Sequence, residues 1–265
     1  MGSDTPLGTS VEYEVIKYKS GSAEPAKVQV ATEVPFTIMV NETEVVTLMC
    51  TPENLEELCY GFLFTSGIIE SRDDVVSYLC DESRWMAQVT IEEMPDLSML
   101  SKRLYTSGCG KGVMYSSLVE ITSRHPLKTA FKVDKDALIE LMRWLQKSSD
   151  LFKKSGGVHS AALSENGKTP KIAIDDVGRH NAVDKAIGDG LIRGVDFSQC
   201  VLVCSGRTSA DMLHKARRSG IPVTISRGAP THQTILLARE MGVTVVGFAR
   251  GGGFTIYTHP GRIVF

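Results

Sequence analysis

From residue 157 onward, short apolar segments alternate with segments of helical periodicity, and this alternation constrains the fold more than any other feature. The apolar segments have the composition of buried strands, and apolar residues recur at helical spacing in the segments between them. This order is typical of an α/β domain. We expect strands at 158–163, 171–174, 200–204, 222–225, 243–248 and 254–257, and helices at 181–192, 209–219 and 232–242.

Residues before 126 follow a different pattern, in which strand-like segments predominate. Thr51 and Pro52 are typical of a helix start and Gly67 of a helix end, so Cys59 should lie on a helix and pack. We expect strands or a hairpin at 27–50, strands at 75–80 and 87–93, and helices at 51–66 and 133–149, the last burying Leu138, Leu141, Met142 and Leu145. The predicted fold is α+β overall, with a smaller β-rich domain (1–125) and an α/β domain (126–265).

The composition limits the kinds of partner and the compartment. The net charge is −2 and no basic tract occurs, which argues against a general nucleic-acid or membrane surface. The first residues lack the pattern of a secretory signal and no apolar run reaches transmembrane length, so we expect a cytoplasmic protein. Six cysteines are scattered without a CxxC pair, which indicates reduced thiols rather than a disulfide framework or a zinc finger.

Four of the predicted strands are followed by segments that contain both glycine and arginine: Arg179, Arg207, Arg227 and Arg250. Ligands of open α/β sheets lie beyond the carboxyl ends of the strands, so the arginines would converge there if these strands are parallel. Guanidinium groups and helix N-termini both bind phosphate oxygens, which predicts a phosphate-rich ligand. The alternative is that surface loops simply contain Gly and Arg. None of the segments has the spacing of an ATP-hydrolysing or nicotinamide-binding loop.

Other polar residues near these strand ends have both a structural and a functional interpretation. Asp175 and Asp176 could orient Arg179 or bind the sugar of a ligand, although adjacent acids at a strand end are also ordinary turn residues. His159 lies in an apolar strand and His180 at a helix start, and each could serve either a structural hydrogen bond or catalysis.

Two further residues are expected to take no part in chemistry. His214 shares a helix with Lys215, Arg217 and Arg218 and should be solvated. Cys204 ends an apolar strand and should pack as a small hydrophobic side chain.

Cys109 differs from the other cysteines because it lies between glycines, in the segment TSGCGKGV. A structural cysteine normally lies among apolar neighbours. Here Lys111 follows two residues later, and a nearby cation favours the reactive thiolate.

Several segments together resemble the FdhD family, the formate dehydrogenase accessory sulfurtransferases. They are GFLFTSGII, TSGCGKG, GGVHSAAL, DDVGRHNAVDKAIG, CSGRTSADMLHKA and SRGAPTHQTILLARE, and the resemblance runs from about Pro35 to His259. DVGRHNAVDK is long and specific, and the segments occur in the order that the family has.

The resemblance implies a carrier of sulfur with a cytidine deaminase-like C-terminal domain. Family members are similar in taking a sulfane sulfur from a cysteine desulfurase as a persulfide. They pass it to the molybdenum or tungsten bis(molybdopterin guanine dinucleotide) cofactor, which is then inserted into formate dehydrogenase. The resemblance also implies a homodimer, with GDP or GMP as possible mimics of the cargo. The expected persulfide residue is Cys109, and the expected cofactor contacts are Phe248, Ala249, Arg250, Gly251, Gly252 and Gly253, together with Arg179, His180, Ser205, Arg207 and Arg227.

One departure from the family leaves two functions open. Many members have a second cysteine three residues after the first, where this chain has Gly112. A local disulfide therefore cannot release the sulfur, and the chain could instead be a cofactor-binding chaperone without chemistry. Zinc-dependent deamination would need H-x-E and P-C-x-x-C motifs. The chain has HSA at 159–161 and no PCxxC, so we expect no zinc.

Overall fold

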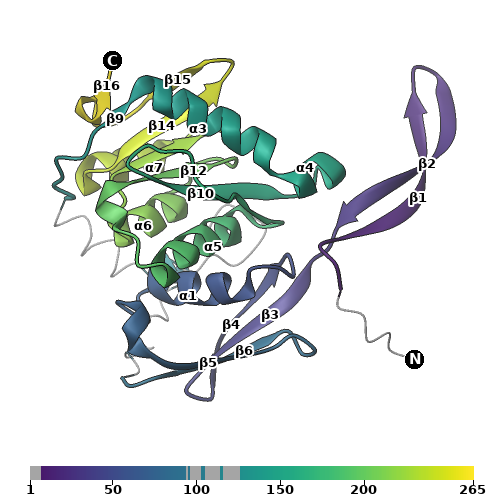
Figure 1. The fold of residues 1–265 in the computed structure, drawn as a ribbon, viewed down its shortest axis with the longest axis horizontal. Helices are drawn as coiled ribbons and strands as arrows, with labels where there is room; N and C mark the ends of the chain where they lie inside the picture. Colours follow the sequence, from purple (N-terminus) through teal and green to yellow (C-terminus); the bar gives the residue numbers. More distant parts are fainter. Residues whose placement is uncertain (1–6, 94, 96–102, 105–113, 116–125) are drawn as a thin grey trace.

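A computed structural model of the chain describes residues 7–93, 95, 103–104, 114–115 and 126–265. Its C-terminal half is built on a six-stranded sheet with the order β11-β10-β12-β13-β14-β15 (Figure 1). The strands are β10 (His159–Glu165), β11 (Ile174–Asp176), β12 (Cys200–Cys204), β13 (Val223–Ser226), β14 (Thr244–Arg250) and β15 (Gly253–Ile256). β10 and β15 run in the direction opposite to the other four strands of the sheet. β11, β12, β13 and β14 are therefore parallel to one another, and their carboxyl ends lie at the same edge.

Helices cover both faces of this sheet, which gives the three-layer arrangement expected and confirms the predicted fold class (Figure 1). One face is covered by α3 (Lys135–Ser148), whose predicted apolar stripe is buried. The other face is covered by α5 (Arg179–Ile192), α6 (Ala210–Arg218) and α7 (His232–Met241). Because both faces are covered, strands such as β12 are apolar along their whole length.

A second, four-stranded sheet with the order β4-β3-β6-β5 forms the N-terminal half, as the β-rich pattern predicted. Its strands are β3 (Val34–Val40), β4 (Thr43–Cys50), β5 (Val75–Asp81) and β6 (Met86–Ile91), and α1 (Leu55–Ser66) packs between this sheet and α5. The two helices touch backbone to backbone, because a Cβ added at Gly61 would overlap the carbonyl oxygen of Asp184. One hydrophobic cluster therefore spans both sides of residue 125.

The start of α1 differs from the sequence prediction, whereas its end agrees with it. The helix begins at Leu55 after Asn54, which adopts a left-handed conformation, and not at Pro52. Gly67 ends the helix with a φ of 80°. Cys59 is fully buried, and burial raises the pKa of its thiol well above the ordinary range, so its packing role is confirmed.

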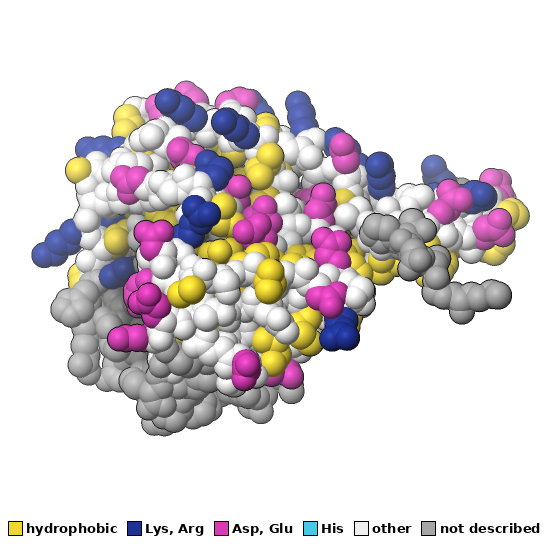
Figure 2. All heavy atoms as spheres, turned by 60° about the horizontal axis from the view of Figure 1, so that its bottom comes forward, with side chains coloured by type: hydrophobic (Ala, Val, Ile, Leu, Met, Phe, Trp, Pro, Cys, Tyr) yellow, Lys and Arg dark blue, Asp and Glu magenta, His cyan; other side chains and the backbone are white. Residues whose placement is uncertain are grey.

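A long hairpin projects from the body as a separate arm (Figures 1 and 2). It consists of β1 (Ser10–Lys19) and β2 (Ser22–Ala31), and β1 was not predicted. The arm carries charged residues and exposed hydrophobic residues, including Tyr13, Ile16 and Tyr18. The remaining elements are α4 (Asp150–Ser155), β7 (Arg103–Leu104), β8 (Met114–Tyr115), β9 (Val133–Asp134), β16 (Ile263–Val264) and short 3₁₀ turns at Arg72–Asp74, Phe197–Gln199 and Pro260–Arg262.

Candidate functional site

The four segments with Gly and Arg lie side by side at the carboxyl edge of the six-stranded sheet, and glycines let them approach closely. A Cβ at Gly206 would lie 3.1 Å from the Cβ of Arg179, and a Cβ at Gly228 would lie 2.9 Å from the Cα of Arg207. Phe248 continues the series, because its N–H donates to the carbonyl oxygen of Gly228 over 3.0 Å. The segments therefore form one continuous surface.

A cavity of about 530 Å³ opens at this edge, between β10 and the end of α3. Ser205 and Arg227, two of the predicted cofactor contacts, line it, and His159 joins them from β10. The Oγ of Ser205 lies 3.3 Å from Nδ1 of His159 and accepts from the backbone N–H of Ser160 over 3.0 Å. Burial and the nearby Arg179 lower the pKa of His159, so its imidazole is neutral at neutral pH.

A second cavity, of about 310 Å³, lies beside the first and contains the predicted stretch from Ala249 to Gly253. Met142 and Gln146 of α3 line both cavities, so the two are adjacent. The chain turns sharply between β14 and β15 because Gly251 and Gly252 adopt positive φ angles of 62° and 82°. Both are conformations that residues with a Cβ rarely adopt.

Positive charge at this edge is spread out rather than concentrated at a point. Arg207, Arg227 and Arg250 are exposed, and none has an ion-pair partner among the described residues. The guanidinium of Arg250 lies 5.5 Å above the Phe248 ring. Arg179 follows β11 and Arg250 is the last residue of β14, and these two strands are four positions apart in the sheet, or about 19 Å at the usual spacing. The segments that carry the arginines therefore follow one edge of the sheet, over a width that suits an extended polyanion.

His180 lines neither cavity. Its Nε2 lies 3.4 Å from the hydroxyl of Ser209 and 3.6 Å from Oδ2 of Asp211, both at the start of α6. Burial, Lys215 and Arg179 lower the pKa of His180 to about 3. A neutral histidine bonded to a helix start fits the structural interpretation.

The acidic pair after β11 also has structural contacts. Asp176 is fully buried and accepts hydrogen bonds from the backbone of Thr51 and Gly178, and it forms an ion pair with Lys185. Asp175 accepts hydrogen bonds from the hydroxyls of Ser149 and Ser160, each over 2.6 Å. Lys185 was missed as a partner, although a lysine at a predicted core position of a helix is a signal for a buried ion pair.

Cys204 and His214 had opposite outcomes. Cys204 is buried and its thiol pKa is raised to about 11 by burial, so the packing interpretation is confirmed. The solvated position predicted for His214 is wrong, because only 8% of the residue is exposed. Burial and the adjacent Arg217 and Lys215 lower its pKa to about 4. The apolar face of α6 is wider than the surrounding basic residues suggested.

Some predicted features fall outside the described part of the chain. Cys109 lies between β7 and β8 in the sequence, beyond the described residues. Within the described ranges, no cluster of three His, Cys, Asp or Glu side chains could hold a metal ion. In the same ranges, no helix is both long and apolar enough to span a membrane.

Comparison with known proteins places the chain in a family. The model of the FdhD/NarQ family matches residues 31–264. The sulfur carrier protein FdhD of Bacillus subtilis is 36% identical, over 94% of this chain and 96% of its own length. The protein of the same name from Staphylococcus aureus strain MRSA252 is 38% identical, over 100% of this chain and 98% of its own length.

A solved structure shares the fold over nearly the whole chain. It is a crystal structure from Desulfotalea psychrophila, described as a formate dehydrogenase accessory protein, with a TM-score of 0.80 and 26% identity over 97% of this chain and 100% of that one. The family match covers both halves of the chain and all four glycine–arginine segments. The chain therefore belongs to the FdhD/NarQ family.

Proposed function

We propose that this protein carries sulfur for the maturation of a formate dehydrogenase. Cys109 holds the sulfur as a persulfide, and the acceptor is a molybdenum or tungsten bis(molybdopterin guanine dinucleotide) cofactor bound as cargo at the carboxyl edge of the sheet. The proposal is supported by full-length relatives that are named sulfur carrier proteins and by a structural relative described as a formate dehydrogenase accessory protein. The cytoplasm is the compartment in which we expect the transfer.

The observation that carries the cargo site is the row of exposed arginines beside two adjacent cavities. Arg227 lines one cavity and Arg250 lines the other. Arg207 lies on the segment that connects the end of β12 to the start of α6. Pyrophosphate oxygens suit these guanidinium groups, because the forked donors can bind two oxygens each. A cargo with two dinucleotide arms is long enough to use an edge about 19 Å wide.

Sulfur enters by thiol exchange. The Cys109 thiolate attacks the outer sulfur of a persulfide on the desulfurase. The S–S bond of that persulfide breaks, the desulfurase cysteine leaves as a thiolate, and Cys109 becomes the persulfide. Glycines on both sides of Cys109 leave the thiolate accessible, and Lys111 favours its ionised form. With Gly112 in place of a second cysteine, the sulfur passes to the metal centre directly from the persulfide, or an outside reductant completes the cycle.

The test is intact-protein mass spectrometry after incubation with a cysteine desulfurase and cysteine. The wild-type chain should gain one sulfur that a reductant removes, and Cys109→Ser should gain none. Cys80→Ser is the matched control, since Cys80 is an exposed cysteine in β5 of the four-stranded sheet. Loading of Cys109→Ser to the wild-type level would refute the proposal.

A second candidate is a cofactor chaperone without sulfur chemistry, which the absence of a cysteine at position 112 favours. It predicts that Cys109→Ala still supports dehydrogenase maturation in cells, whereas the sulfur carrier predicts loss. In both cases GDP should bind, because the arginine edge does not depend on Cys109.

We further propose a homodimer in which the projecting arm contacts the second copy. The register of the arm places Val11, Tyr13 and Val15 opposite Val30, Val28 and Ala26 on one apolar face. Isolated two-stranded hairpins are only marginally stable in water, so such a face needs a covering surface. Sedimentation of the wild type and of Tyr13→Lys tests this: the variant should become monomeric.

A further inference from the structure

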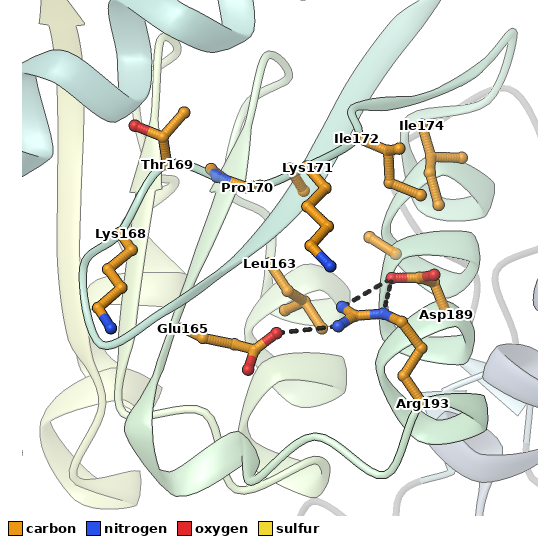
Figure 3. A pocket seen from close by; sticks show the side chains of 12 residues that line it. Leu163, Glu165, Lys168, Thr169, Pro170, Lys171, Ile172, Ile174, Asp189 and Arg193 are labelled. Atoms are coloured by element: carbon orange, nitrogen blue, oxygen red, sulfur yellow. Dashed lines mark hydrogen bonds and ion pairs between the residues drawn. The ribbon is translucent and has the colours of Figure 1, made fainter.

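A groove lies at the end of the six-stranded sheet opposite the candidate site, and none of the predicted site residues lines it (Figure 3). Its floor is the outer edge of β10, one wall is the C-terminal half of α5, and the other is the segment 168–172. Its volume is about 500 Å³, which lies in the usual range of ligand sites.

The backbone of β10 has a free edge inside this groove. β11 pairs with β10 only as far as Ala161, and within residues 126–265 no other strand continues the ladder on that side. On the opposite side of β10, the carbonyl oxygen of Ser160 accepts from the N–H of Ser205, and the N–H of Asn166 donates to the carbonyl oxygen of Gln199. The backbone N–H and C=O groups of even-numbered residues therefore point toward β12. Because this direction alternates along an antiparallel strand, the N–H and C=O of Leu163 face the groove.

Apolar side chains surround that free edge. The side chains of Leu163 and Ile174 are 5% and 3% exposed, and Ala186 of α5 lies beside them. Ile172 lies beside Ile174 and is 48% exposed (Figure 3). The groove can therefore take an aliphatic side chain next to a strand that lacks a partner.

The charges of the groove favour an acidic ligand. Arg193 is held by Asp189 on its own helix and by Glu165 at the end of β10, with N–O distances of 2.9 Å. Lys171 points toward this group and forms no ion pair with any residue in the described ranges (Figure 3). Lys168 adds a third cation farther along the segment and points away (Figure 3). Arg193 is already paired with two carboxylates, so Lys171 is the cation beside this group that has no ion-pair partner among the described residues.

We propose that this groove binds an extended, acidic peptide segment of a partner protein. The segment adds a short strand to β10 by pairing with the backbone of Leu163, and it places an aliphatic side chain over Ile174. An acidic side chain of the segment binds Lys171. Pairing with a sheet edge is a common mode of peptide recognition, in which the main chain gives affinity and the pockets give specificity. The site does not depend on sulfur or on cargo.

The test uses the full ¹⁵N-labelled chain and a panel of fluorescent, acetylated hexapeptide amides that alternate Glu with Val or Ile. Saturable shifts are expected at the amides of Leu163 and Glu165. Lys171→Glu should weaken binding about ten-fold, the effect of one charge-assisted contact. Lys168→Glu makes the same charge change on the same segment and should weaken binding by less than about three-fold.

Control ligands distinguish the binding of an acidic peptide strand from the binding of other ligands. Peptides with Lys in place of Glu, or with alternate backbone nitrogens methylated, should not bind, since they lack the charge or the strand donors. The proposal is overturned if no acidic member of the panel saturates, or if the methylated peptides bind equally well. It is also overturned if octanoate alone reproduces the shifts, because the groove would then be a site for small acids. The same holds if raising the concentration of the protein alone reproduces them, because the occupant would then be a second copy of the chain.

Discussion

Lys185 and Asp176 form an ion pair in which neither side chain has any solvent exposure, with 2.8 Å between Nζ and Oδ2. Nζ also donates to the carbonyl oxygen of Thr51, whose own N–H donates back to Asp176. Thr51 lies between β4 and α1, so the pair joins the N-terminal half to the base of the candidate site. Part of the DVGRHNAVDK segment therefore serves the architecture rather than a ligand.

Replacing Lys185 by Met should lower the free energy of unfolding by about 3–5 kcal/mol, because Asp176 would keep its charge in a buried place without its partner. Urea denaturation, monitored by circular dichroism, measures the free energy of unfolding. Lys153→Met is the control, since its ion pair with Asp150 is largely exposed and screened by solvent, so its loss should change the free energy of unfolding little. Equal, small losses in both variants would contradict the structural role.

Removal of single arginines at the carboxyl edge should weaken the binding of GDP. Arg227→Ala and Arg250→Ala should each raise the dissociation constant about ten-fold, as expected for the loss of one charge-assisted contact, while leaving stability unchanged because both side chains are exposed. Titration calorimetry measures the affinity. Arg84→Ala is the control, because this exposed arginine lies between β5 and β6 of the N-terminal sheet. If both variants bind GDP like the wild type, the anion site lies elsewhere.

The contact between α1 and α5 should not tolerate a methyl group. Gly61→Ala would drive a Cβ into the backbone of Asp184, and backbone cannot move aside as a flexible side chain can. We expect a loss of about 3 kcal/mol, although Ala favours helices by about 1 kcal/mol. Gly261→Ala, which has open space around it, should change the melting temperature little. A Gly61→Ala variant as stable as the wild type would show that the helices can separate.

The sequence predicted the strands and helices of the C-terminal half because both faces of its sheet are covered, which makes each strand a continuous apolar run. β1 was missed although Val11, Tyr13 and Val15 alternate with Glu12 and Glu14, which is the pattern of a strand with one apolar face. It lies outside the core, since Val11 is 41% and Ile16 67% exposed. Pro52 suggested a helix start that the structure places at Leu55, since Thr51 is engaged with Asp176 and Val177 instead.

The candidate site was predictable in its placement and not in its geometry. Glycine and arginine after four strands identify an edge, but their relative positions depend on strand order, and β10 inserts between β11 and β12. Local sequence does not determine that order. The burial of His214 likewise depends on what packs against α6, which neighbouring residues in the chain do not reveal.

His214 should make the protein less stable as the pH falls. Its pKa is about 4 in the folded protein and about 6.5 when unfolded, so the unfolded chain binds the proton more tightly. The stabilisation is complete above pH 6.5 and is lost progressively toward pH 4, by about 2 kcal/mol between pH 7 and 5. His214→Leu should flatten this slope in urea titrations at several pH values. The exposed His232→Leu should not, and an unchanged slope in His214→Leu would exclude this histidine as the cause.

Placing a cysteine at position 112 should convert the carrier into one that releases its sulfur. In Gly112→Cys, the new thiolate can attack the inner sulfur of the Cys109 persulfide, which forms a disulfide between residues 109 and 112 and expels hydrosulfide. After loading by a desulfurase, free sulfide should appear without added reductant, and the intact mass should fall by the transferred sulfur and two hydrogens relative to the persulfide. Cys109→Ser/Gly112→Cys, which lacks the carrier thiol, controls for loading of the new cysteine. A persulfide on Gly112→Cys that lasts as long as the wild-type one would mean that the two positions do not meet, and that a second thiol there plays no part in release.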